Sequence, residues 1–142
     1  HTLVLGSLLG GNNIGDRGAI AIAEALKMNV ALQELYLSDG IIGDAGAMAL
    51  AEGLKVNGVL KTLWLTDNCI GDEGAVAIGE ALRVNRSAIT RLSLFRNSIR
   101  RSALGVMNSD TSSLAPGHNT SSRLKLWSTV RSCLRSVTSG SL

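Results

Sequence analysis

The sequence is poor in aromatic residues and in the residue types that form most enzyme active sites. Only 3% of its 142 residues are Phe, Trp or Tyr, and the chain has one proline and two histidines. We therefore expect an aliphatic core and exclude a collagen-like chain. His1 and His118 have no placed partner, and the recurring glycine segments lack the Lys-Ser/Thr of a phosphate-binding loop. These absences predict no catalytic site, no metal site and no cofactor.

Cysteine is scarce, and long apolar runs are missing. Cys69 and Cys133 occupy unlike contexts, without the CxxC spacing or the nearby histidine of a zinc site. This pattern favours reduced thiols, so we expect a cytoplasmic protein. No apolar run approaches the roughly 18 to 20 residues that a membrane-spanning helix needs. Because the chain opens at His1 and not at Met, we expect it to be a piece of a longer protein.

The net charge of +3 is divided unevenly along the chain. Residues 1–82 hold ten acidic and four basic residues, whereas residues 83–142 hold one acidic and ten basic residues. The basic character belongs to one end of the chain, which indicates a change of architecture there. The net charge alone therefore does not indicate a nucleic-acid-binding protein.

One segment occurs three times at a constant offset of 28 residues. It reads IGDRGAIAIAEALKMN from Ile14, IGDAGAMALAEGLKVN from Ile42 and IGDEGAVAIGEALRVN from Ile70. A leucine pattern precedes the third copy as Leu60, Leu63, Leu65 and Asn68, and it returns 29 residues later as Ile89, Leu92, Leu94 and Asn97. This period with an LxxLxLxxN pattern is typical of leucine-rich repeats, in which each unit adds a strand and a helix to a stacked solenoid.

The residues of each unit agree with this interpretation. Leu35 and Leu37 alternate with Tyr36, as in a strand with one buried face. The IGD segment then gives way to helical periodicity, with Ala47, Leu50, Ala51 and Leu54 on one face. Asp16, Asp44 and Asp72 stand where a helix start favours an N-cap acceptor or a negative charge. Asn29, Asn57 and Asn85 suit the helix ends.

These motifs resemble the ribonuclease-inhibitor type of leucine-rich repeat, also found in NOD-like receptors, Ran GTPase-activating proteins and many protist proteins. The resemblance covers residues 1–100, about four units, and implies an α/β horseshoe with parallel strands on the concave face and helices on the convex face. It also implies a ladder in which an asparagine after each strand bonds neighbouring loop backbone. Asn12, Asn68 and Asn97 match that position. Gly40 departs from it, so we expect the ladder to be interrupted and the loop to be looser in the second unit.

The outward strand positions are the candidate contacts of a protein partner. In register they are Glu34, Tyr36 and Ser38, then Thr62, Trp64 and Thr66, then Arg91, Ser93 and Phe95. Three of the four aromatic residues fall in this set, and aromatic and Arg side chains are frequent anchors of protein interfaces. The alternative is that they only improve strand propensity and cross-strand packing.

The repeat pattern stops after Ile99, and residues 101–142 form a Ser- and Arg-rich tail. We expect it to be flexible, with residues 123–137 able to form a basic amphipathic helix. Such a helix suits a membrane surface, an acidic partner or a cap over the end of the solenoid. The alternative is an ill-ordered tail without a function.

Together these patterns predict a non-catalytic scaffold that binds a protein partner of unknown identity on its concave face. We expect no nucleic-acid ligand, and no membrane contact unless through the tail. We expect the parent to be a larger NOD-like-receptor-type or protist repeat protein. The alternative is a GTPase-activating regulator similar to the Ran-activating family, for which Arg96 and Arg100 are the only candidates to act on a bound GTPase.

Overall fold

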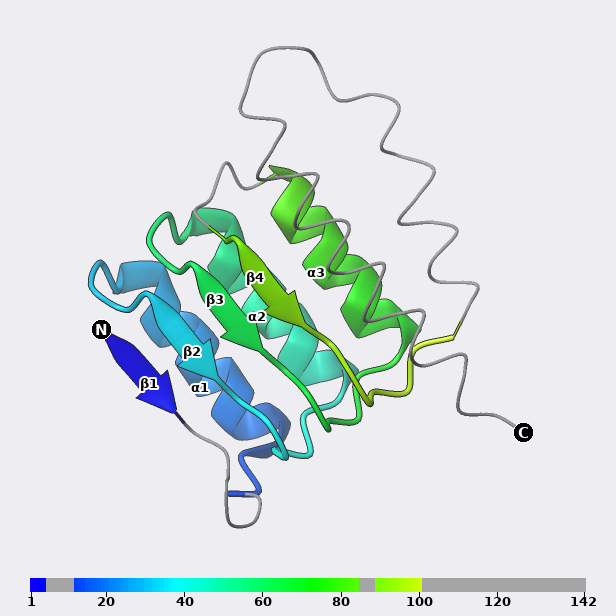
Figure 1. The fold of residues 1–142 in the computed structure, drawn as a ribbon. Coiled ribbons are helices and arrows are strands. Elements are labelled where there is room, and N and C mark those ends of the chain that lie inside the picture. Colours follow the sequence, from blue (N-terminus) through cyan, green and yellow to red (C-terminus); the bar gives the residue numbers. More distant parts are fainter. Residues whose placement is uncertain (5–11, 85–88, 101–142) are drawn as a thin grey trace.

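The computed structural model describes residues 1–4, 12–84 and 89–100, in which short strands alternate with helices at the predicted period (Figure 1). In chain order the elements are β1 Thr2–Val4, α1 Gly15–Met28, β2 Glu34–Tyr36, α2 Asp44–Val56, β3 Thr62–Trp64, α3 Asp72–Val84 and β4 Arg91–Ser93. The first three units each consist of a three-residue strand followed by a helix of 13 or 14 residues. The fourth unit contributes the strand β4.

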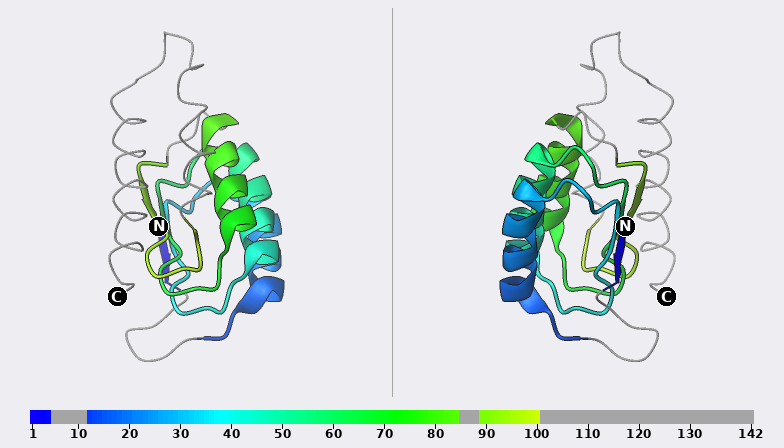
Figure 2. Two further views of the ribbon diagram at one scale, coloured as in Figure 1. Left: turned by 90° about the vertical axis from the view of Figure 1, so that its right-hand side faces the viewer. Right: turned by 90° about the vertical axis from the view of Figure 1, so that its left-hand side faces the viewer.

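The strands form one parallel sheet in the order β1-β2-β3-β4. Equivalent leucines are paired across it, because Leu35 is in register with Leu63 and Leu63 with Leu92. The side views show two layers, the sheet on one side and α1, α2 and α3 stacked in the same order on the other (Figure 2). The molecule is thus an α/β solenoid, as the repeats predicted.

The core lies between the two layers and is aliphatic. Alternate leucines of each strand segment and one face of each helix are fully or almost fully buried. The strand segments contribute Leu35, Leu37, Leu63, Leu65, Leu92 and Leu94. The helices α2 and α3 contribute Ala47, Leu50, Ala51, Leu54, Ala75, Ile78 and Leu82. In α1 the equivalent Ile22 is only partly buried, since the described chain places a helix on one side of α1 alone. The predicted helix faces are confirmed.

The helices approach closely because small residues lie between them. A Cβ added at Gly74 in α3 would lie 2.7 Å from Oδ1 of Asp44 and 2.8 Å from Cβ of Ala47 in α2. Gly46 meets α1 at similar distances. Contacts this short are closer than van der Waals separation, so glycine is required for this spacing of the stack.

The aspartates at the helix starts cap a different helix from the one expected. Asp44 lies in the first turn of α2, as predicted, but the N-cap of α2 has no side-chain bond. Instead, Oδ1 of Asp44 accepts the N–H groups of Gly71 and Gly74, both at 2.8 Å, at the start of α3. Asp16 binds the start of α2 in the same way. The three aspartates thus place a negative charge in the first turn of their helices, as one of the two expected roles required. The other expected role, an N-cap acceptor of the same helix, is not found for Asp16 and Asp44, because the stack sets each of these carboxylates beside the next helix.

The helix ends agree with prediction at Asn29 and Asn57, which are the C-caps of α1 and α2. Asn85 lies outside the described residues. So does the predicted tail, residues 101–142, with its possible helix at 123–137. Within the described part of the chain, every helix is too short or too polar to cross a membrane.

Candidate partner-binding surface

The sheet register brings the predicted contact residues together in rows on the face opposite the helices. One row holds Glu34, Thr62 and Arg91, and the next holds Tyr36, Trp64 and Ser93. Ser38, Thr66 and Phe95 follow the ends of β2, β3 and β4. Residues from three units thus share one surface, which we call the concave stripe.

Tyr36 and Trp64 form the centre of the concave stripe. Their ring centroids are 5.3 Å apart, and the ring planes are tilted by 55°. Trp64 is 42% exposed although its ring packs against Tyr36. Tilted pairs at this separation are a favoured aromatic geometry. The prediction that these two rings lie side by side is confirmed, and the pair leaves indole surface free for contact.

Glu34 lies beside this pair and is bound to neutral donors. Its Oε2 atom accepts a hydrogen bond from the Thr2 hydroxyl at 3.0 Å and a long one from the Tyr36 hydroxyl at 3.5 Å. The side chain is partly buried. These bonds hold a negative charge at one edge of the concave stripe.

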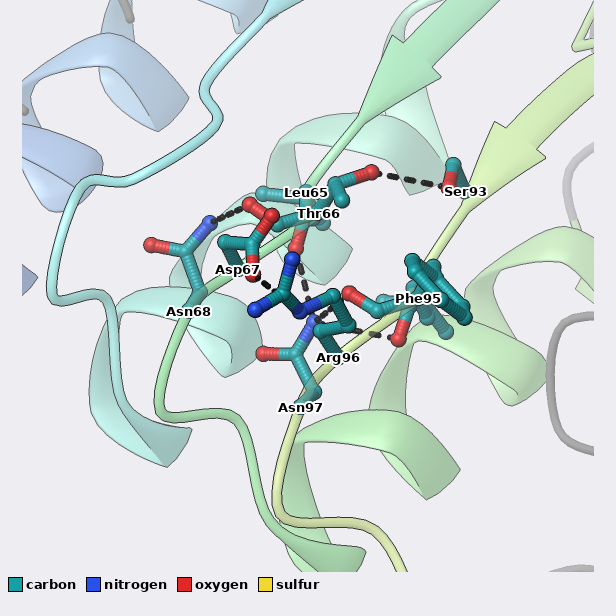
Figure 3. A network of polar contacts seen from close by, with 9 residues as sticks. Leu65, Thr66, Asp67, Asn68, Ser93, Phe95, Arg96 and Asn97 are labelled. Carbon is teal, nitrogen blue, oxygen red and sulfur yellow. Dashed lines mark hydrogen bonds and ion pairs between the residues drawn. The ribbon is translucent and has the colours of Figure 1, made fainter. Parts of the chain in front are cut away.

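The other members of the concave stripe differ in what they offer. Arg91 is exposed, and Phe95 is 38% exposed. Thr62 is only 2% exposed and presents little surface to a partner. The hydroxyls of Thr66 and Ser93 lie 2.9 Å apart and satisfy each other (Figure 3). Apolar and charged surface is therefore concentrated at Tyr36, Trp64, Phe95, Glu34 and Arg91.

Two asparagines, one buried and one partly buried, support the turns that follow the strands. Oδ1 of Asn68 accepts the N–H groups of Gly40 and Ile42, at 3.0 and 2.9 Å, and Nδ2 donates to the carbonyl of Leu37 at 2.8 Å. Asn97 repeats the arrangement one unit later, with Nδ2 donating to the Leu65 carbonyl at 2.7 Å (Figure 3). These two side chains join neighbouring units through backbone groups.

The first two positions of the asparagine ladder, Asn12 and Gly40, differ from the later positions, Asn68 and Asn97. Asn12 is exposed and lies next to residues outside the described part, so its role in the ladder stays a prediction. Gly40 has no side chain to extend the ladder, which agrees with the expected interruption. The loop is nevertheless held, because Gly40 is buried, its N–H is bound by Asn68 and its carbonyl accepts the N–H of Gly15 at 2.7 Å.

A further feature of this edge was not recognised in the sequence. Asp39, Asp67 and Arg96 hold equivalent places in three turns, and all have positive φ, between 53° and 55°. Nε of Arg96 lies 2.8 Å from a carboxylate oxygen of Asp67 (Figure 3). The shared place in the repeat is visible in the sequence, whereas the left-handed conformation and the ion pair depend on the turn geometry.

The described residues contain no group of three or more His, Cys, Asp or Glu side chains arranged to hold a metal ion. His118 and Cys133 lie outside the described part of the chain. Of the two arginines nominated for a GTPase-activating role, Arg96 is paired with Asp67. Arg100 bonds Asp72 through its backbone N–H at 2.6 Å and its Nε at 3.0 Å.

A family model described as Leucine Rich repeat matches residues 9–23, 29–51 and 56–79. These segments include β2, β3, the first turns of α1, α2 and α3, and Asn68. The chain folds as a leucine-rich-repeat solenoid. No curated protein sequence matches it.

A solved structure supports the same fold. The leucine-rich-repeat solenoid aligns with leiomodin-1 actin-binding site 2 at a TM-score of 0.63 and 20% sequence identity. The alignment covers 97% of this chain and 83% of that one. At this identity, the likeness establishes the fold and carries no residue role from one chain to the other.

Proposed function

We propose that this solenoid is a non-catalytic module that binds a protein partner across the concave stripe. The observation that carries the proposal is the Tyr36 and Trp64 pair, in which Trp64 stays 42% exposed in a chain with few aromatics. Phe95 adds a second exposed ring. Clustered aromatic side chains on a rigid surface are frequent anchors of protein interfaces.

The charges and the fold support the same proposal. Glu34 and Arg91 lie on β2 and β4, with β3 between them, so a partner would meet opposite charges at opposite edges of the concave stripe. Complementary charges of this kind favour one orientation of a partner. Leiomodin-1 site 2 is named for binding actin, which supports a protein as the ligand of this fold.

We further propose that the module is part of a larger cytoplasmic protein of the ribonuclease-inhibitor type, such as a NOD-like receptor or a protist repeat protein. The three copies of the IGD segment at a 28-residue offset support this subfamily. The proposal includes no nucleic-acid ligand and no membrane contact by the described residues.

The test compares two triple variants of the full chain. Tyr36→Ala, Trp64→Ala and Phe95→Ala remove the aromatics of the concave stripe. Ile20→Ala, Met28→Ala and Met48→Ala remove exposed apolar side chains from α1 and α2 as a matched control. Partners captured by the wild-type chain are purified, and their Kd for each variant is measured by calorimetry after circular dichroism has shown that both variants fold.

We expect the concave variant to weaken binding at least tenfold and the control to leave it unchanged. Unchanged binding to the concave variant, or a loss confined to the control, would overturn the proposal. A GTP hydrolysis assay with a panel of small GTPases tests the GTPase-activating alternative, and we expect no acceleration. Acceleration that Arg96→Ala or Arg100→Ala abolishes would favour that alternative.

A further inference from the structure

Glu34 lies next to an aromatic pair, and its charge has no counter-ion in the described chain. The donors to Oε2 are the neutral hydroxyls of Thr2 and Tyr36, at 3.0 and 3.5 Å. The ion pairs found among the described residues join other side chains. A carboxylate with two oxygens accepts more bonds than these.

The basic residues nearest to Glu34 in the sheet either bond another side chain or lie too far away to form an ion pair with it. Lys61 precedes β3 and donates to Oε1 of Gln33 at 3.4 Å. Arg91 shares the row of Glu34, but it lies two strands away with Thr62 between them. Neighbouring strands are about 4.8 Å apart, so the two backbones are separated by about twice that distance. The charge of Glu34 is therefore available to an external cation.

The rings beside Glu34 are suited to the same kind of ligand. A cation is attracted to the face of an aromatic ring, most strongly to that of Trp, when it lies within about 6 Å of the ring centre. Trp64 is partly exposed and packs against the tilted ring of Tyr36, whose hydroxyl donates to the Glu34 carboxylate, so both rings lie in the same part of the concave stripe as that carboxylate. A purely apolar side chain docked there would instead bury the Glu34 carboxylate without a counter-charge, which is unfavourable.

We infer that Glu34, Tyr36 and Trp64 form a binding site for one cationic side chain, Lys or Arg, of the protein partner. This inference rests on the proposed function and names the chemistry that the concave stripe recognises. The methylene stem of the ligand packs on Trp64, and its charged group lies between the indole face and the Glu34 carboxylate. The Thr2 and Tyr36 hydroxyls keep the carboxylate in place.

The experiment uses two small probes of equal stem length. The full chain, labelled with ¹⁵N, is titrated with N-acetyl-lysine methylamide and with its uncharged norleucine counterpart, and the indole N–H signal of Trp64 is followed by NMR. Comparison with Trp64→Phe assigns that signal and separates it from the signal of Trp127. Glu34→Gln keeps the size of the side chain and an acceptor oxygen, and Glu52→Gln on α2 is the matched control.

We expect saturable shifts with the lysine probe and at least tenfold weaker binding of the norleucine probe. Glu34→Gln should weaken binding of the lysine probe at least fivefold, and Glu52→Gln should leave its binding unchanged. Equal binding of both probes, no saturation up to 100 mM, or no effect of Glu34→Gln would overturn the inference. If the probes fail while the aromatic triple variant still loses its partner, only the cation site is wrong. If the probes bind and that variant keeps its partner, the proposed function is wrong.

Discussion

Single asparagine side chains carry much of the connection between one unit and the next. Asn68 is 7% exposed and makes four hydrogen bonds to backbone groups, two as acceptor and two as donor. A buried polar group without a partner is costly, so the N–H groups of Gly40 and Ile42 and the Leu37 carbonyl depend on this one amide, whereas the Thr66 carbonyl also accepts the N–H of Asp39. Asn29 contrasts with it, because it is exposed and uses only its oxygen, which accepts the N–H groups of Ala31 and Leu32.

This contrast predicts different effects of the same substitution. Asn68→Asp keeps the acceptor oxygen but sets a second carboxylate oxygen against the carbonyls of Leu37 and Thr66. We expect the free energy of unfolding to fall by about 3 kcal/mol, because buried donors and acceptors lose their partners. Asn29→Asp keeps both of its bonds and adds only a negative charge at the end of α1, so we expect a loss below about 1 kcal/mol. Urea unfolding followed by circular dichroism measures both.

Equal losses for the two variants would contradict this account of Asn68. The unfolding slopes are compared as well, since a changed slope would mean a changed folded or unfolded state and not a lost bond.

At the scale of elements, the distance between helices is set by glycines at equivalent places. Gly46 faces α1, and Gly74 faces α2. The same glycines donate their N–H groups to Asp16 and Asp44 of the preceding unit. One residue thus serves both the packing of two helices and the cap at the start of one of them.

A methyl group at this place should therefore disturb the stack. In Gly74→Ala, the new Cβ would lie within 3 Å of Asp44, Ala47 and Ile70, so α3 must move away from α2. We expect a loss of about 1 to 3 kcal/mol in the free energy of unfolding, as for other overpacked cores. Gly58→Ala is the control, because a Cβ there meets no atom within 4 Å. Gly58→Ala should be neutral or slightly stabilising, since it restricts the unfolded chain.

Thermal and urea unfolding of the two alanine variants test this point. A Gly74→Ala variant as stable as the wild-type chain would show that the helices are not held at the separation described.

The elements themselves could be predicted because their signals are local and repeated. Leu35 and Leu37 indicate a strand, and Leu50, Ala51 and Leu54 indicate a helix face, within a few residues of one another. For Asp16 and Asp44 the helix that the carboxylate caps could not be predicted. The sequence shows how far a residue lies from the start of its own helix, whereas its distance from the next helix depends on how the units stack. Asp44 is near Gly71 only because two units pack side by side.

The candidate surface could be predicted only in part, for a related reason. The strand alternation and the 28-residue offset place Tyr36 beside Trp64 without a structure. The burial of Thr62 and the two neutral partners of Glu34 depend on how neighbouring side chains fold over the sheet. The ion pair of Asp67 and Arg96 likewise requires the left-handed turns that set these residues beside each other.

At the scale of the whole molecule, the contacts between the described helices and between the described strands join neighbouring units. Among the described elements, α2 packs against both α1 and α3, whereas α1 packs against α2 alone. In α1 three residues are buried, whereas α2 and α3 have six buried residues each. In a solenoid of this kind, the stability of each unit depends on its own residues and on its immediate neighbours.

Local opening should therefore be easier in α1 than in α2. We expect hydrogen exchange of the wild-type full chain to be at least tenfold slower for the amides of α2 than for those of α1. Exchange should also be slower for Leu37 and Leu65, which follow β2 and β3 and donate to the next strand, than for Gln33, whose N–H donates to the His1 carbonyl. Exchange followed by mass spectrometry or NMR measures these rates. Gly74→Ala should speed exchange in α3 more than in α1, because the altered contact lies between α2 and α3. Equal rates in α1 and α2, with Gly74→Ala raising both alike, would instead show that the units open together as one cooperative structure.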